Sequence, residues 1–122
     1  MVEVICDTSF LIHLATRRIK NISTFETEIG TLQFVLPDVV VSELQNLLKN
    51  EKKKPDIIAT LDYSEKLKKI SILGKFADKA LIEYVKQHGG IIGTMDKDLK
   101  FMVKKNGGSI ISFSNDRIIL ES

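Results

Sequence analysis

The stretch VEVICDTSFLIHL, residues 2–14, changes its pattern in the middle. Its first part, VEVIC, is a mostly apolar run typical of a strand buried within a sheet. Its last part, FLIHL, begins an apolar helical face, and the polar residues Asp7, Thr8 and Ser9 separate the two. Asp7 has two explanations at this point. Its carboxylate caps the helix, or it serves a ligand, because ligands bind at the carboxyl ends of strands in open α/β sheets.

The rest of the chain alternates strand and helix patterns, which predicts a mostly parallel sheet covered by helices on both faces. We expect strands over residues 2–6, 31–36, 91–94, 109–113 and, at an edge, 117–120, with a short connector over 69–73. We expect helices over residues 9–18, 21–29, 38–50, 76–88 and 96–105, and one from Pro55 with Ile57, Ile58 and Leu61 turned inward. The predicted fold class is α/β, a three-layer α/β/α sandwich with a central sheet of about five strands.

The composition is that of one ordinary globular domain over residues 1–122, with 43% hydrophobic and 28% charged residues. No apolar run reaches the length of about 18 residues that a membrane span needs. The N-terminus has no basic region followed by an apolar stretch, so we expect no signal peptide and a cytoplasmic location. Cys6 is the single cysteine, which excludes an internal disulfide and a cysteine-based zinc site.

Four acidic residues fall where this topology can bring them together. Asp7 ends the first strand and Asp96 follows the strand at 91–94, and parallel strands share one carboxyl edge. Asp78 lies in the first turn of its helix, and Glu43 interrupts an apolar helical face. Each residue also has a purely structural explanation. Asp7 and Asp96 can be helix caps, Asp78 can suit a helix dipole, and Glu43 can point to solvent.

If the four carboxylates converge, cations must offset their repulsion. Carboxylate oxygens without nearby cysteine or histidine favour Mg²⁺ or Mn²⁺ over zinc. One or two such ions are the equipment for hydrolysing phosphodiester bonds with a metal-activated water. With these four of the 16 acidic residues in a site, the 18 lysines and arginines leave the remaining surface at about +6, which suits a nucleic-acid backbone.

Lysines gather in several clusters along the chain. Solvated helix surface is the simpler explanation for any one cluster. The alternative is contact with RNA phosphates, for which we select Lys52, Lys53, Lys54, Lys97 and Lys100 as candidates.

Four segments together resemble the PIN-domain ribonucleases: VICDTSFLIHL, LPDVVVSELQNLL, FADKALIEYVKQHGGIIGTMDKDLK and GGSIISF. The resemblance covers essentially the whole chain, and an acid, a helix, Gly-Gly, a strand and Thr-x-Asp-x-x-Leu in this order are its most specific part. It implies an endoribonuclease that acts on RNA with Mg²⁺ or Mn²⁺. The catalytic and metal-binding acids of the family fall on Asp7, Glu43, Asp78 and Asp96.

The resemblance also implies supporting residues and partners. The small polar residues that assist the acids fall on Ser9 and Thr94, and Asp98 holds a place that is often acidic and can contact metal through water. The closing SFSNDRIILES adds an edge strand, which is more similar to the PIN branch linked to ribosomal-RNA processing than to the compact toxin branch. A homodimer and an RNA-processing partner are expected on this basis.

Two alternatives stay open within the same fold. One is a ribonuclease toxin that an antitoxin partner blocks, and the other is a non-catalytic RNA-binding or assembly module. Receiver domains and phosphatases of the haloacid-dehalogenase type also carry an aspartate at a strand end. They are disfavoured because VEVICDTS lacks the acidic pair of a receiver, and Ser9 stands where such a phosphatase needs a second aspartate.

Overall fold

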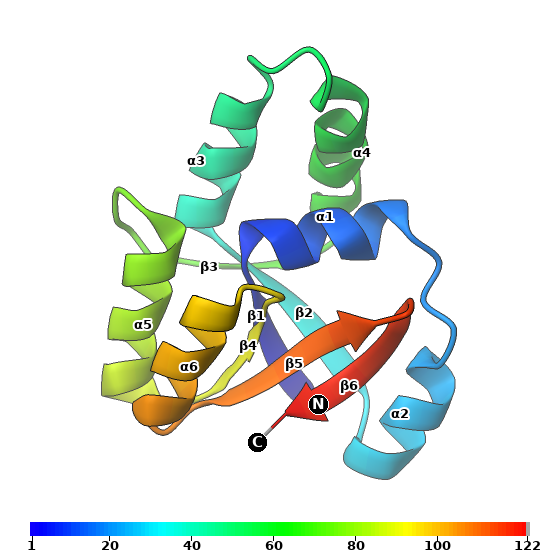
Figure 1. Cartoon of the computed structure of the whole chain (residues 1–122), viewed down its shortest axis with the longest axis vertical. Coiled ribbons are helices and arrows are strands. Elements are labelled where there is room, and N and C mark those ends of the chain that lie inside the picture. The colour runs from blue at the N-terminus through cyan, green and yellow to red at the C-terminus, as the bar shows by residue number, and fades with distance from the viewer. Residues whose placement is uncertain (122) are drawn as a thin grey trace.

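A computed structural model of the chain describes residues 1–121. Its strands form a single six-stranded sheet in the order β3-β2-β1-β4-β5-β6 (Figure 1). The strands are β1 (Val2–Cys6), β2 (Leu32–Pro37), β3 (Lys68–Ile70), β4 (Ile91–Gly93), β5 (Ser109–Ser114) and β6 (Arg117–Glu121). The helices are α1 (Thr8–Thr16), α2 (Ile22–Ile29), α3 (Asp38–Leu47), α4 (Lys54–Ser64), α5 (Ala77–His88) and α6 (Lys97–Lys105).

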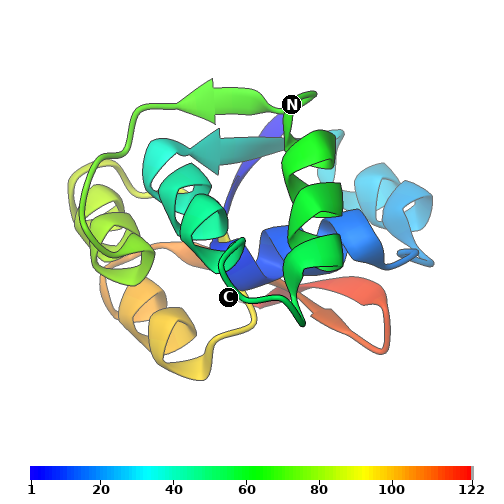
Figure 2. The same cartoon turned by 90° about the horizontal axis from the view of Figure 1, so that it is seen from above.

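The helices divide between the two faces of the sheet. The chain moves through the sheet in one direction from β1 to β3 and in the opposite direction from β4 to β6, and right-handed crossovers place the connecting helices on opposite faces in the two halves. Figure 2 shows α5 and α6 on one face and α1, α2 and α4 on the other. The predicted α/β/α sandwich is confirmed, and it has six strands where about five were expected.

The strand β1 lies inside the sheet, and its carboxyl end sets the position of the site. It pairs in parallel with β2 and with β4, where Cys6 is opposite Gly93. The backbone N–H of Asp7 continues this pairing by donating to the carbonyl oxygen of Gly93 at 2.9 Å. Asp7 therefore leaves the sheet at the edge where β4 also ends.

Two predicted details were wrong. In α4, Ile57 is 1% exposed but Ile58 is 52% exposed, because neighbouring residues on a helix point about 100° apart and the side of α4 that faces the core includes Ile57 and not Ile58. The helix expected over 38–50 ends at Leu47, and short turns fill the chain before α4. The connector predicted over 69–73 overlaps the edge strand β3, which pairs with β2. No helix within residues 1–121 is both long and apolar enough to cross a membrane.

The core packs tightly against the carboxyl end of β4. Phe10, fully buried at the start of α1, stacks on Phe113 of β5 with ring centroids 4.5 Å apart. Gly93 lies under the Phe10 ring so closely that a Cβ atom there would stand 2.8 Å from it. The small residue at 93 thus lets α1 approach β4, and this brings Asp7 next to Thr94.

Candidate active site

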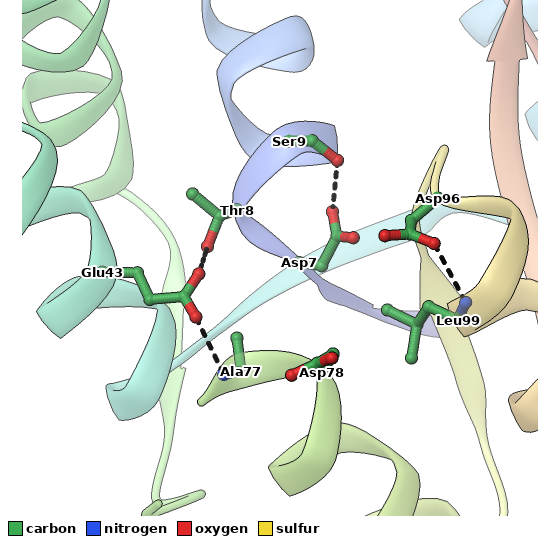
Figure 3. A pocket seen from close by; sticks show the side chains of 8 residues that line it. All are labelled: Asp7, Thr8, Ser9, Glu43, Ala77, Asp78, Asp96 and Leu99. Atoms are coloured by element: carbon green, nitrogen blue, oxygen red, sulfur yellow. Dashed lines mark hydrogen bonds between the residues drawn. The ribbon is translucent and has the colours of Figure 1, made fainter. Parts of the chain in front are cut away.

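A pocket of about 250 Å³ opens at the carboxyl edge of the sheet (Figure 3). It is lined by Asp7, Thr8, Ser9, Glu43, Ala77, Asp78, Asp96 and Leu99. The four predicted carboxylates therefore meet at one pocket, although they come from the ends of two strands and from two helices. No histidine or cysteine lines this pocket, so its charged groups are all carboxylates.

Asp7 is the buried member of the group, with 7% of its surface exposed. One carboxylate oxygen, Oδ1, accepts the backbone N–H of Phe10 at 2.8 Å and the hydroxyl of Ser9 at 3.2 Å. The other oxygen, Oδ2, accepts the hydroxyl of the fully buried Thr94. Burial raises the pKa of the Asp7 carboxyl, and the hydrogen bonds from Thr94, Phe10 and Ser9 oppose that rise. Asp7 therefore caps α1 and also lines the pocket, so the capping role is confirmed and the ligand-binding role stays a prediction.

Asp96 follows the same pattern at the start of α6. Its Oδ1 accepts the backbone N–H groups of Asp98 at 2.8 Å and Leu99 at 3.1 Å, which makes it the cap of α6. Its second oxygen has no hydrogen-bond donor among residues 1–121. In Figure 3 the carboxylate of Asp96 points toward Asp7, and its charge contributes to the raised pKa of Asp7. One oxygen thus holds the helix and the other remains available to the pocket.

Glu43 joins three helices at the opposite wall. Its Oε1 accepts the hydroxyl of Thr8 on α1 at 2.6 Å, and its Oε2 accepts the backbone N–H of Ala77 at 2.9 Å. That N–H belongs to the first residue of α5, whose N-terminal amides have no partner inside the helix. The predicted helical phase, which turned Glu43 away from solvent, is consistent with its place in the pocket.

Thr8 and the N–H of Ala77 are partners that the sequence did not predict. Nothing local in the chain connects them to Glu43, which lies 35 residues from Thr8 and 34 from Ala77. The one available signal was the absence of a capping side chain before α5, since Phe76 occupies that position. An uncapped helix start beside a lining carboxylate suggests such a contact.

Asp78 and Asp98 are both exposed to solvent. Asp78 lines it from the first turn of α5 and accepts the backbone N–H of Lys79 at 2.9 Å. Asp98 does not line this pocket. It lines a neighbouring depression together with Asp78, Asp96 and apolar residues of α5 and α6. The structure therefore brings Asp98 beside the four carboxylates and not among them.

The candidate RNA-binding lysines separate into two groups. Lys53 lines a small depression that shares Ser9 with the acidic pocket, and Lys97 directly follows Asp96. Lys100 instead donates to Glu121 of β6 at 2.8 Å, and this bond lowers the pKa of the Glu121 carboxyl. Lys52 and Lys54 are exposed near the start of α4. Only Lys53 and Lys97 thus adjoin the pocket or one of the carboxylates that line it.

The donor set suits a hard divalent cation. The pocket offers four carboxylates and no nitrogen or sulfur side chain, which is the chemistry that Mg²⁺ and Mn²⁺ select. Asp7 is a buried acid whose charge is opposed by desolvation and by Asp96, and a cation would relieve both effects. Within residues 1–121 no three aspartate, glutamate, histidine or cysteine side chains are already arranged around one ion position. The chemistry fits, and ligation requires the side chains to move together.

Comparisons with known proteins agree with this geometry. A family model described as a PIN like domain matches residues 4–115. Among solved structures, the chain is similar to one described as the PIN domain endonuclease Utp24, with a TM-score of 0.75 and 27% identity over 98% of this chain and 90% of that one. It also shares its fold with a domain of a functionally unknown protein from Methanocaldococcus jannaschii, with a TM-score of 0.63 and 18% identity over 93% and 92% of the two chains. No curated protein matches the sequence.

Proposed function

This chain belongs to the PIN-like domain family, and on that premise we propose that it is an endoribonuclease that uses Mg²⁺ or Mn²⁺ to hydrolyse RNA phosphodiester bonds in RNA processing. The observation that carries the proposal is the meeting of Asp7, Glu43, Asp78 and Asp96 at one pocket. The similarity to an endonuclease supports the same conclusion.

The three aspartates are the proposed ligands of the ion, and Glu43 binds it directly or through water. When bound, such an ion neutralises charge on the scissile phosphate and lowers the pKa of a water molecule. The chain supplies the positions of the oxygens. Ser9, Thr94 and the N–H of Phe10 fix Asp7. The capping bonds of Asp96 use one of its oxygens and leave the other for the pocket.

RNA is the proposed substrate because of the charge around the pocket. The chain outside the four carboxylates carries about +6. Lys53 lines a depression that shares Ser9 with the acidic pocket, and Lys97 directly follows Asp96. Lysines in these positions can hold phosphates of the RNA backbone. The antiparallel strand β6 supports the RNA-processing role over the compact toxin. A small antitoxin gene next to the gene for this chain would oppose that choice.

The decisive experiment compares Asp96→Asn with a matched change outside the pocket. Asparagine caps helices as well as aspartate does, so the fold of this variant should survive. We expect its Mn²⁺-dependent cleavage of RNA to fall by about 100-fold or more, because a ligand charge is lost. Asp62→Asn removes the same charge from an exposed position on α4 and should cleave like the parent. Equal cleavage by all three proteins would refute the role of Asp96.

A non-catalytic RNA-binding module is the competing function, and one observation favours it. Asp7, Glu43 and Asp96 each accept hydrogen bonds that stabilise helix starts or join helices, so each has a structural role without any metal. The two functions differ in what happens to bound RNA. A module would bind structured and unstructured RNA and leave both intact with Mg²⁺ and Mn²⁺, whereas a nuclease would convert at least one of them to shorter products.

A further inference from the structure

The loop between β3 and α5 exposes two large apolar side chains, and one of them, Phe76, is next in the chain to a residue that lines the acidic pocket. Leu73 is 77% exposed and Phe76 is 50% exposed. Phe76 directly precedes Ala77 and Asp78. These two residues line the pocket at the start of α5 and are labelled in Figure 3. A single exposed apolar side chain is ordinary on a protein surface, so Phe76 is distinguished by the charged groups around its ring.

Two lysines surround the same ring. The amine of Lys75 lies 5.7 Å and that of Lys79 lies 5.5 Å from the centroid of Phe76. Both cation–π contacts found in residues 1–121 fall on this one ring. Phe101 is even more exposed, at 65%, and has no such contact among the described residues. The combination of an open aromatic face and two cations is therefore particular to Phe76.

An unpaired RNA nucleotide matches this combination. Its base is a flat, uncharged ring that can stack on Phe76, and the phosphates on either side are negative groups that the lysines can bind. Bases of any type stack on exposed aromatic side chains, and neighbouring lysines hold the backbone. Stacking with a base is stronger than a solvent-exposed cation–π contact. An incoming base can therefore displace a lysine amine from the Phe76 ring, and the released amine can bind the adjacent phosphate.

Backbone hydrogen bonds hold the main chain of Phe76 next to the pocket lining. The carbonyl oxygen of Phe76 accepts the N–H of Ala80 at 3.1 Å in the first turn of α5. The next residue, Ala77, is buried and donates its N–H to Glu43 at 2.9 Å. Consecutive Cα atoms are about 3.8 Å apart, so the ring of Phe76 starts within one residue of the pocket lining.

We propose that Phe76 is a stacking site for one unpaired base of the RNA, and that Lys75 and Lys79 hold the phosphates next to that base. The proposal rests on the proposed function, because it takes RNA to be the substrate of the acidic pocket. The stacking site adds a requirement to the proposed function. RNA whose nucleotide beside the cut is unpaired should bind better than the same sequence held in a duplex.

The first test uses Phe76→Trp as a reporter. The sequence contains two tyrosines and no tryptophan, so this variant has a single tryptophan, which can be excited selectively at wavelengths that tyrosine does not absorb. In metal-free buffer, which prevents metal-dependent cleavage, a short unpaired oligoadenylate should quench the fluorescence as it binds. The same oligonucleotide with abasic positions should bind with little quenching. Phe101→Trp is the matched control, and its fluorescence should be insensitive to both.

The second test measures affinity directly by the fluorescence anisotropy of a labelled oligoadenylate. Phe76→Ala should weaken its Kd by about 5- to 100-fold, the range that loss of one stacked base produces. Phe101→Ala should leave the Kd within a factor of about two. Replacing Lys75 and Lys79 by glutamine should reduce the slope of log K against log salt by about 0.7 for each lysine.

The outcomes separate this proposal from the proposed function. Base-dependent quenching by a protein that cleaves no RNA would support the stacking site and refute the nuclease. If the parent cleaves RNA and Phe76→Ala binds RNA with the same Kd as the parent, the nuclease is supported and the stacking site is refuted. Equal losses in Phe76→Ala and Phe101→Ala would overturn the assignment to Phe76. Absence of RNA binding would overturn it as well. So would a blue shift of the Phe76→Trp fluorescence with phosphatidylserine vesicles and no response to RNA, which would indicate a membrane contact.

Discussion

The buried hydroxyl of Thr94 donates a hydrogen bond to Oδ2 of Asp7, across the ends of the neighbouring strands β4 and β1. The same hydroxyl oxygen accepts the backbone N–H of Asp96 at 3.1 Å. A single side chain that is 0% exposed therefore organises two of the four carboxylates. Because buried polar atoms need partners, loss of this hydroxyl leaves the buried Asp7 one donor short, and it removes the acceptor of the Asp96 N–H.

Thr94→Val tests that relationship. Valine has a similar shape and no hydroxyl, so Asp7 loses a donor and the N–H of Asp96 loses an acceptor. We expect the free energy of unfolding to fall by about 1–3 kcal/mol. Metal-dependent cleavage should fall by about 10- to 100-fold, the usual effect of removing a group that positions a metal ligand. Urea denaturation and a cleavage assay on the same preparation measure the two effects.

Thr60→Val is the control for burial. Thr60 is also 0% exposed, and its hydroxyl donates to the carbonyl oxygen of Asp56 inside α4 at 2.7 Å. Thr60→Val should lose some stability and keep its cleavage rate. Thr94→Ser keeps a hydroxyl, so it should recover most of the stability and most of the cleavage that Thr94→Val loses. If Thr60→Val and Thr94→Val cleave equally well, Thr94 contributes to the fold alone.

Asp7→Asn should stabilise the metal-free protein at neutral pH. Burial raises the pKa of the Asp7 carboxyl above its ordinary value of 3.8. The folded chain thus holds this proton more tightly than the unfolded chain, and ionisation of Asp7 costs stability. The parent loses that stability as pH rises from 3.8 through the raised pKa, and the whole penalty remains at neutral pH. Asparagine keeps the capping oxygen and carries no charge.

Thermal melting in EDTA from about pH 3 to pH 8 measures this difference. We expect the Tm of Asp7→Asn to exceed that of the parent by roughly 2–5 °C at pH 7 and the two values to converge at acidic pH. Mn²⁺ should raise the Tm of the parent and have little effect on the variant. A parent that is as stable as the variant at neutral pH, with equal Mn²⁺ shifts in both, would show that Asp7 neither bears a penalty nor binds the ion.

The strand-end carboxylates could be predicted from the sequence because their positions follow from topology. A parallel sheet puts all strand ends at one edge, and Asp7 and Asp96 end or follow apolar strands. The prediction posed capping and ligand binding as alternatives. The structure shows that they are compatible, since a carboxylate has two oxygens and the capping bonds of Asp96 use only one of them.

The partners of Glu43 could not be predicted, because they depend on how closely α1, α3 and α5 approach one another. That spacing results from core packing and has no local signal near Thr8 or Ala77. The same reason explains Ile58, whose apolar character suggested a buried side although the face of α4 turned toward the core includes Ile57. Distances between carboxylates are likewise a tertiary property, so the sequence predicts a shared pocket and no ligand geometry.

Glu43→Gln separates the charge of this residue from its hydrogen bonds. The amide oxygen can still accept the N–H of Ala77, and the hydroxyl of Thr8 can turn to accept from the amide nitrogen. We expect a change of about 1 kcal/mol or less in unfolding free energy and a loss of at least about 10-fold in cleavage. Thr8→Val removes one donor and keeps the carboxylate, so it should cleave faster than Glu43→Gln. If Glu43→Gln retains full cleavage, Glu43 only stabilises the start of α5.

Cys6 provides a probe of the site that requires no cleavage. It is the residue before Asp7, its side chain is fully buried in β1, and burial raises the pKa of its thiol. The thiolate is the form of cysteine that attacks thiol reagents, so Cys6 should react only when the end of β1 opens. Its labelling rate therefore measures the free energy of that opening.

We expect Mn²⁺ to slow the labelling of Cys6, because an ion held by Asp7 must leave before β1 opens. At a concentration 100 times its Kd, an ion that binds only the closed form reduces the open population by about 100-fold. The rate with a thiol reagent such as 5,5′-dithiobis(2-nitrobenzoate) is followed at constant pH with and without Mn²⁺. Asp7→Asn should label at the same rate in both conditions, whereas Asp62→Asn should behave like the parent. Equal slowing of the parent and of Asp7→Asn would mean that the ion binds elsewhere on the chain.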